Sequence, residues 1–498
     1  MNYLKTIPIL LIFSLTSCSE KEPLKTSKIN AFINKAMDSV EIVPSLSVAI
    51  IDSTGIVMVK GFGRSDIENN IRATEKTNYY IASTTKSFVG FLATILDDEN
   101  HIMLNSEITS YKPFSEFESK DVFENVTIRD LLSHQSGLDN GFLSFRLAYS
   151  GSYTREDILR IIEDYTFLRE EGKQFEYTNL GYYLYSVILK EELGSNWQDL
   201  IDEKVFTPLQ MEIASAYISQ SPEKLTAQPY YGTFPDSFKK AGTIKSDETM
   251  HAAGGLMMNA EDAAKSLQFY LNKGKLNNYQ VYPEEIVKKS YQKEVETDKL
   301  SFFYDASGYG LGWLHANYKG HKMVTHLGGY IGYKASITFF PEESLGVAVF
   351  TNHQELGRSL GNTVSDYIYE LYLGNTNAIE KYGDSLLVAL KERLKVVQKR
   401  ETEGKEEWGV PVWNLSLSNE SYTGKFYNDK DGLIIITYKD GKFVVNSGNL
   451  TTYGEPNPDL DCFQVELIST SRKSLCFKRE NNTITGIDFR DKFFKKID

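Results

Sequence analysis

Residues 81–96 read IASTTKSFVGFLATIL and decide how the rest of the chain is interpreted. Their apolar spacing predicts a buried helix that begins near Ser83. Lys86 follows three residues later, so on a helix both side chains share one face. Free N–H groups at the start of a helix favour developing negative charge. Because a serine hydroxyl needs a nearby base or cation before it can attack, this stretch predicts a covalent serine hydrolase.

The Ser-x-x-Lys spacing occurs three more times in the chain without this context. Ser221 is followed directly by a proline, Ser237 lies in the polar run PDSFKKAG, and Ser290 lies in the charged run KKSYQKEVE. These surroundings predict solvated surface at all three serines. Only Ser83 follows an extended segment and opens a long apolar helix.

A second motif is Tyr177-Thr178-Asn179, which leads into another apolar helix. A tyrosine acts as a general base only if nearby cations lower its pKa, and Lys86 could supply that field. Asn179 carries a donor and an acceptor, which suits it to hold both Lys86 and a substrate amide. The alternative is a helix N-terminal cap beside a packed aromatic ring.

A third motif is His326-Leu327-Gly328-Gly329, which precedes the alternating strand pattern KASITFF. Glycines at such a place allow close approach of a ligand or a second backbone. The amides of Gly329 and Ser83 could then form an oxyanion hole. The remaining histidines outside the HAAGGL segment are interpreted as structural: His101, His134, His315, His321 and His353.

In this order the three motifs resemble those of the serine β-lactamase and penicillin-binding-protein superfamily. The chain is most similar to the class C branch, with its D-alanyl-D-alanine carboxypeptidases, D-aminopeptidases and family VIII esterases. Residues 30–375 carry the likeness, which includes the segments VTIRDLLSHQSGL, HAAGGLMMNAEDAAK, YGLGW and LGVAVFTN. The resemblance implies an α/β fold in which helices flank a central antiparallel sheet, with a helical subdomain beside it.

The resemblance also implies a role for each motif residue. Ser83 would form the acyl-enzyme, with Lys86 and Tyr177 sharing the work of the base. The substrate would be bound by Asn179 and by the strand residues His326, Gly328 and Gly329.

One position departs from the family pattern. Many relatives have Lys-Thr-Gly or Lys-Ser-Gly in the third motif, or a hydroxyl residue after the histidine, where this chain has Leu327. The loss weakens the case for β-lactams and for peptides that end in a free carboxylate, and it favours neutral esters, amides or a peptide that is anchored differently. An esterase or a D-amino-acid peptidase is therefore favoured over a true β-lactamase. A non-catalytic envelope protein that binds peptidoglycan fragments or a partner in the same cleft is the alternative.

The N-terminus predicts export. A lysine and a short apolar run precede Leu15-Thr16-Ser17-Cys18, which resembles a bacterial lipobox. We therefore expect residues 1–18 to be a lipoprotein signal peptide, residues 19–29 to be a tether, and a lipid on Cys18 to anchor the protein to a membrane of the bacterial cell envelope, on the periplasmic side or at the outer membrane. The alternative is an ordinary signal peptide with a stray cysteine.

Composition narrows the possible partners. The formal charge is −13, which argues against nucleic acid. No Gly-x-Ser-x-Gly, His-Glu-x-x-His or complete dinucleotide motif occurs, so we expect no metal and no cofactor. The expected partner is a small ester, amide or peptide substrate.

The end of the chain follows a different pattern. Residues 376–411 predict a helical connector, and residues 412–498 alternate like a small antiparallel barrel or sandwich that resembles a lipocalin-like domain. Cys462 and Cys476 lie in two strand-like runs. Export permits a disulfide between them, but two buried free thiols fit the sequence equally well.

Overall fold

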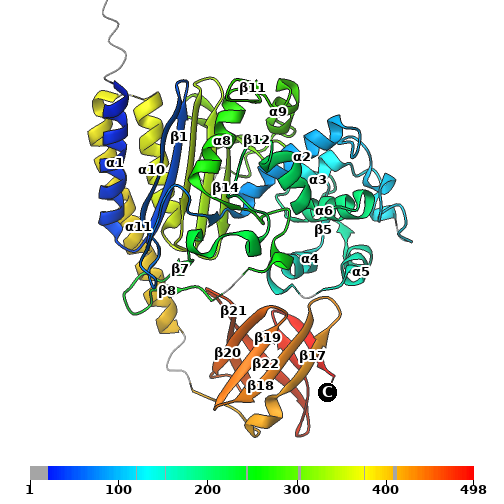
Figure 1. The fold of residues 1–498 in the computed structure, drawn as a ribbon. Coiled ribbons are helices and arrows are strands. Elements are labelled where there is room, and N and C mark those ends of the chain that lie inside the picture. Colours follow the sequence, from blue (N-terminus) through cyan, green and yellow to red (C-terminus); the bar gives the residue numbers. More distant parts are fainter. Residues whose placement is uncertain are drawn as a thin grey trace, which may run out of the picture.

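The computed structural model describes residues 21–118, 120–151, 153–242, 245–300, 304–374, 376–407 and 412–497. An α/β unit forms most of the molecule, and a β-barrel formed by the C-terminal residues lies below it in the view of Figure 1.

An antiparallel sheet of eight strands forms the centre of the α/β unit. In spatial order the strands are β12 (Asp305–Tyr309), β13 (Leu314–Tyr318), β14 (His321–Tyr330), β15 (Tyr333–Phe340), β16 (Leu345–Thr351), β1 (Ser45–Asp52), β2 (Gly55–Asp66) and β3 (Ile71–Arg72). The central strands are apolar almost throughout because both faces of the sheet are covered.

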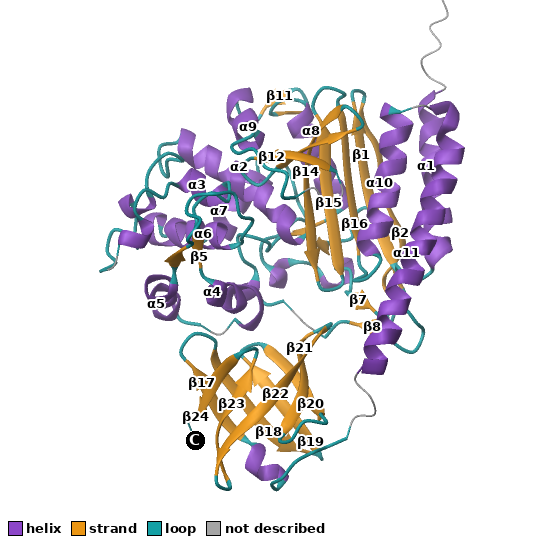
Figure 2. Cartoon of the chain, turned by 180° about the vertical axis from the view of Figure 1, so that it is seen from behind, coloured by secondary structure: helices purple, strands orange, loops and turns teal. Residues whose placement is uncertain are grey.

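Alternate residues of β1 belong to two separate hydrophobic cores. Ala49 and Ile51 face a core shared with α2 (Thr85–Asp98) and α8 (Ala260–Leu271). Val48 and Ile50 face the other, which contains residues of α1 (Lys21–Val40), α10 (Gly357–Leu373) and α11 (Ile379–Glu407). Figure 2 shows these three helices gathered at one side of the sheet. The predicted flanked sheet is confirmed.

A helical subdomain lies beside α2. It consists of α3 (Ile128–Leu132), α4 (Gly141–Phe145), α5 (Arg155–Tyr165), α6 (Leu180–Leu193) and α7 (Trp197–Ile201), while α9 (Glu284–Tyr291) packs on α2. Four small two-stranded sheets complete the unit: β4 (Tyr79–Tyr80) with β9 (Met257–Met258), β5 (Leu138–Asp139) with β6 (Phe167–Leu168), β7 (Tyr230–Tyr231) with β8 (Lys239–Lys240), and β10 (Lys275–Leu276) with β11 (Tyr279–Gln280).

The C-terminal strands close into a barrel, so the predicted small β-domain is a barrel and not a sandwich. Its strands are β17 (Gly424–Asn428), β18 (Gly432–Lys439), β19 (Lys442–Ser447), β20 (Leu450–Pro456), β21 (Cys462–Ile468), β22 (Ser471–Glu480), β23 (Thr483–Phe489) and β24 (Lys492–Lys496). Its own apolar side chains fill the interior.

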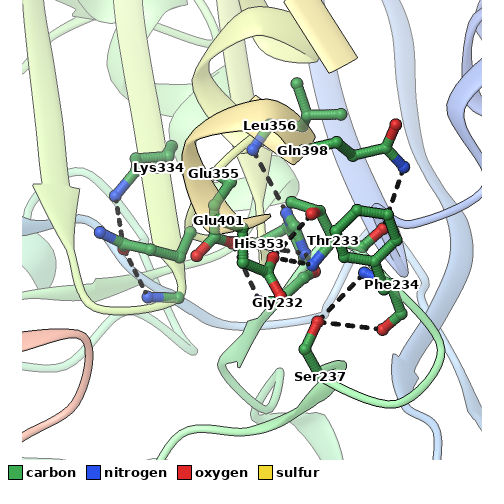
Figure 3. A network of polar contacts seen from close by, with 12 residues as sticks. Gly232, Thr233, Phe234, Ser237, Lys334, His353, Glu355, Leu356, Gln398 and Glu401 are labelled. Carbon is green, nitrogen blue, oxygen red and sulfur yellow. Dashed lines mark hydrogen bonds and ion pairs between the residues drawn. The ribbon is translucent and has the colours of Figure 1, made fainter. Parts of the chain in front are cut away.

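Polar contacts fasten α11 to the α/β unit before the chain enters the barrel. Glu401 accepts hydrogen bonds from the backbone N–H (2.8 Å) and hydroxyl (2.6 Å) of Thr233, and Gln398 donates to the Thr233 carbonyl (Figure 3). His353 Nε2 contacts the neighbouring carbonyl of Gly232 at 3.0 Å. The long helix is therefore held at the β7–β8 hairpin as well as by its apolar face.

The start of the chain differs from expectation in one respect. The segment 19–29 was predicted to be a tether, yet α1 begins at Lys21. Ile29 of this helix is buried in the second core, which explains why the residues around it are helical. The predicted signal peptide and Cys18 lie outside the described residues. Within the described ranges no helix is long and apolar enough to span a membrane.

The structure joins Cys462 and Cys476 in a disulfide. The two residues face each other directly across β21 and β22. Replacing both by alanine should lower the free energy of barrel unfolding by about 3 kcal/mol, because the bond closes a short loop in the unfolded chain. Denaturant unfolding followed by near-UV circular dichroism measures the loss. An unchanged midpoint, together with two titratable thiols in the native protein, would contradict the bond.

Candidate active site

Ser83 lies on a short 3₁₀ turn, Ala82–Thr84, that leads directly into α2. The preceding Ala82 has φ +47°, a left-handed conformation that alanine adopts only when its surroundings enforce it. A backbone hydrogen bond from Ile81 to Leu256 (2.9 Å) fixes the same segment. Ser83 is half-buried, whereas its neighbours in the turn are buried. Ser83 is therefore the residue of this turn whose side chain remains partly accessible to a substrate.

Lys86 is completely buried one helical turn below Ser83. Its Nζ lies 3.4 Å from Ser83 Oγ and donates shorter hydrogen bonds, both 2.7 Å, to Asn179 Oδ1 and the Ala253 carbonyl oxygen. No carboxylate among the described residues pairs with it. Burial alone lowers the pKa of Lys86 well below its usual value. The site therefore favours a neutral amine that can accept the serine proton.

Tyr177 lies against this lysine, with Lys86 Nζ 5.0 Å from the centre of its ring. The expectation that the lysine lowers the pKa of Tyr177 is wrong. Burial raises this pKa to about 12, and a hydrogen-bond interaction with Ser83 offsets only part of that rise. The phenol of Tyr177 therefore keeps its proton at neutral pH.

Asn179 precedes α6 but does not cap it, because its side chain makes no capping hydrogen bond. The side-chain oxygen instead binds Lys86. The alternative interpretation as a helix cap is therefore wrong for Asn179, whereas Thr178 Oγ1 accepts from the first helical N–H, that of Leu180, at 3.2 Å. The predicted contact between Asn179 and Lys86 is confirmed.

His326 is buried and both its ring nitrogens are occupied. Nδ1 lies 3.0 Å from the Leu327 carbonyl oxygen and so carries the proton, and Nε2 accepts from the Tyr309 hydroxyl at 3.0 Å. Burial is the main cause that lowers the pKa of His326 to about 3. The ring is thus a neutral wall of the site.

Gly328 brings β14 against the turn that carries Ser83. A Cβ at this position would lie 1.8 Å from the Ile81 carbonyl oxygen, so no other residue fits without displacing the strand. Gly329 is exposed and pairs with Lys334 across β15. The structure therefore brings the third motif beside the first, as predicted, while the oxyanion-hole role of the Gly329 amide stays a prediction.

His134, which the sequence analysis interprets as structural, is buried beside the site. Its ring centre lies 4.5 Å from that of Tyr177 and 4.8 Å from that of Tyr309. Thr178 N–H donates to its Nδ1 at 3.4 Å, and its buried Nε2 has no hydrogen-bond partner among the described residues. His134 also has φ +62°. The contact of Lys86 with the Ala253 carbonyl oxygen could not be predicted, because side-chain motifs carry no information on which backbone carbonyls line a site.

The other Ser-x-x-Lys serines take no part in the site. Ser290 and Ser221 are buried, so the prediction of solvated surface is wrong for both. The hydroxyl of Ser290 donates to the Val287 carbonyl within its own helix, and that of Ser221 contacts Asn78 and Thr226. Ser237 forms hydrogen bonds within its own loop.

Across the described part of the chain no group of His, Cys, Asp and Glu side chains could hold a metal ion.

Comparison with known proteins gives the family of the chain and relatives of the same fold. The protein flp of Staphylococcus aureus (strain N315) is 23% identical over 312 residues, which span 62% of this chain and 60% of that protein. Among solved structures, the octameric penicillin-binding protein homologue from Pyrococcus abyssi is 21% identical with a TM-score of 0.56 and covers 95% of this chain and 100% of its own. The D-amino acid amidase from Ochrobactrum anthropi SV3, complexed with L-phenylalanine amide, is 20% identical with a TM-score of 0.56 over 74% of this chain and 99% of its own. The family model described as Beta-lactamase matches residues 30–364, and the chain belongs to this family.

Proposed function

We propose that the protein is a serine hydrolase that cleaves ester or amide bonds through an acyl-enzyme on Ser83. The observation that carries the proposal is the buried Lys86, whose Nζ lies 3.4 Å from Ser83 Oγ and is fixed by two short hydrogen bonds to neutral oxygens. A lysine that is neutral at working pH is a competent general base. The amine takes the serine proton as Oγ attacks the substrate carbonyl.

Tyr177 then acts as a proton donor and relay. Its pKa of about 12 keeps the hydroxyl protonated, so it passes its proton to the leaving group and regains one from Lys86. The amides of Ser83 and Gly329 stabilise the negative oxygen of the tetrahedral intermediate. In the second half of the reaction, water attacks the acyl-enzyme carbonyl. The water proton passes through Tyr177 and Lys86 back to Ser83 Oγ, and the acid is released.

Two observations bear on the substrate. The likeness to a D-amino acid amidase supports amides and D-amino-acid peptides beside esters. Lys334 and Arg358 lie behind Gly329: a Cβ on that glycine would lie 3.9 Å from Lys334 Nζ and 3.6 Å from Arg358 Nη2. Neither cation has a carboxylate within ion-pair distance among the described residues, and Lys334 instead donates to Gln354 Oε1 at 2.9 Å. These cations supply positive charge that the Leu327 motif lacks, so we propose that a substrate carboxylate is tolerated there.

A non-catalytic binding protein is the second candidate, and the intact set of Ser83, Lys86, Tyr177 and Asn179 disfavours it. Export and the lipid on Cys18 stay predictions, since that residue lies outside the described ranges.

The nucleophile is tested by a fluorophosphonate probe on the protein truncated after Cys18. Intact and peptide mass spectrometry should show one adduct, on Ser83, that Ser83→Ala abolishes. Ser237→Ala is the matched control, because Ser237 shares the Ser-x-x-Lys spacing but lies in a surface loop, and it should label normally. A folded wild-type protein without an adduct would support the binding-protein alternative.

Tyr177→Phe keeps the ring but removes the proton relay. We expect kcat to fall by about a hundredfold on amides, as for the loss of a positioned acid or base. The loss should be smaller on esters with acidic phenol leaving groups, which depart without a proton. Equal losses on both substrates would show that the hydroxyl serves another step.

Lys334→Met tests the proposed carboxylate contact. The kcat/KM for a D-amino-acid dipeptide with a free carboxylate should fall roughly tenfold, in the range of a lost charged hydrogen bond, while that for the corresponding amide stays within twofold. Lys322→Met serves as the control, because Lys322 is an exposed lysine on the neighbouring strand β14. A parallel loss on both substrates would remove Lys334 from substrate binding.

A further inference from the structure

Lys245 is a buried lysine that the proposed reaction does not use. It lies between β8 and β9, and only 9% of it is exposed. No carboxylate of the described residues forms an ion pair with it. Burial lowers the pKa of Lys245 to about 7. A cation held in such surroundings is costly, so the groups that contact it indicate its purpose.

Two backbone carbonyls hold the amine on one side. Lys245 Nζ donates to the Ala148 oxygen at 2.5 Å and to the Thr249 oxygen at 3.1 Å. Ala148 belongs to a π-helix, Arg146–Ser150, and π-helical turns occur often at functional sites. The lysine therefore joins two segments that are far apart in the sequence.

Three tyrosine rings surround the amine on the other side. Nζ lies 4.4 Å from the ring centre of Tyr330, 5.1 Å from that of Tyr80 and 5.6 Å from that of Tyr149. These distances allow cation–π attraction, which is strongest where water is excluded. The rings of Tyr80 and Tyr330 also contact each other at 4.9 Å.

These rings adjoin the reaction centre. Tyr330 directly follows Gly329, whose amide we place in the oxyanion hole, and Tyr80 precedes Ser83 by three residues. A displacement of the Tyr330 or Tyr80 ring is therefore expected to move the backbone of an oxyanion donor at most three residues away.

The barrel supports the far side of the same cluster. Asn449, in the turn between β19 and β20, donates its backbone N–H to the Ser150 carbonyl at 2.7 Å and its side-chain amide to Ser246 Oγ at 2.9 Å. These two serines belong to the two segments that Lys245 joins. Tyr149 stacks on Tyr330 at 5.9 Å, and Phe145 of the same region is buried in the barrel core. The Lys245 amine thus contacts the π-helix and the end of β14, and the barrel contacts the segments on which Lys245 and the π-helix lie.

We propose that Lys245 is a positioning residue that fixes Tyr330, and through it the Gly329 amide, relative to Ser83, with the barrel as its outer support. The inference rests on the proposed function, because it concerns the oxyanion hole of that reaction. Lys245 itself touches no reacting atom.

The kinetic consequence is specific. An oxyanion donor acts mainly in the transition state, so its displacement lowers kcat and leaves substrate binding nearly unchanged. A residue that contacts the substrate would change KM instead. A residue that serves only stability would lower the melting temperature and leave kcat unchanged.

The test compares Lys245→Met with Lys245→Arg, and with Lys240→Met as the matched control on exposed β8. We expect Lys245→Met to lower kcat roughly tenfold to a hundredfold with KM within twofold, since a shift of about 1 Å in a donor has that effect. Lys245→Arg should restore part of kcat, and Lys240→Met should match the wild type. An unchanged kcat in a folded Lys245→Met protein would overturn the inference.

A second variant keeps the test independent of folding at Lys245. Asn449→Ala removes the side-chain hydrogen bond from the exposed barrel turn to Ser246 and keeps the backbone bond to Ser150, and it should lower kcat about threefold or more, as a lost hydrogen bond allows, with KM unchanged. A wild-type rate in that variant would overturn the supporting role of the Asn449 side-chain contact with Ser246.

Labelling of the wild type separates this inference from the proposed function. If the fluorophosphonate labels Ser83 in the wild type at the same rate as in Lys245→Met and Asn449→Ala, the reaction stands and the positioning role fails. If the folded wild type is not labelled at all, the proposed function fails and the inference falls with it.

Discussion

The site depends on one constraint: the Lys86 amine is buried, and no carboxylate in the described part of the chain balances its charge. A carboxylate beside it would hold the ammonium charged and useless as a base, whereas two neutral oxygens satisfy the neutral amine's donors. The two oxygens come from Asn179 before α6 and from Ala253 before β9. Positions far apart in the chain must therefore converge for the lysine to be buried. The Lys86 amine thereby links the start of α6 in the helical subdomain to the segment before the small β4–β9 sheet.

Close backbone approach is the second requirement. Gly328 lets β14 lie against the Ile81 carbonyl, and the left-handed Ala82 turns the chain so that Ser83 faces the strand. Both features cost conformational freedom or strain. They are compensated by the apolar packing of α2 and α8 against the sheet, where most side chains are fully buried. The rigid packing thus holds a strained turn in a reactive geometry.

The sequence predicted the features that repeat in side-chain patterns. The Ser83–Lys86 spacing, the Asn179 contact and the alternating C-terminal strands all correspond to local regularities, and the structure confirms them. The raised pKa of Tyr177 could not be predicted from the sequence, because the burial of its side chain depends on segments that come together only in the folded protein. The contacts of His134 and Lys245 depend on segments that meet only in the fold, and neither residue has a distinctive neighbour in sequence. The disulfide needed the register of β21 and β22, which no motif encodes.

The charge state of Lys86 is the central claim, and the pH dependence of Ser83 phosphonylation measures it most directly. Because the buried amine loses its proton well below its usual pKa, the second-order rate should rise with pH and level off well below pH 10.5. His326 stays neutral above about pH 3, so it adds no step in this range. The same rise should be absent from Lys86→Met, whose residual rate is slow and flat. A rate in the wild type that continues to rise through pH 10.5, or a rise that persists in Lys86→Met, would contradict a neutral lysine base.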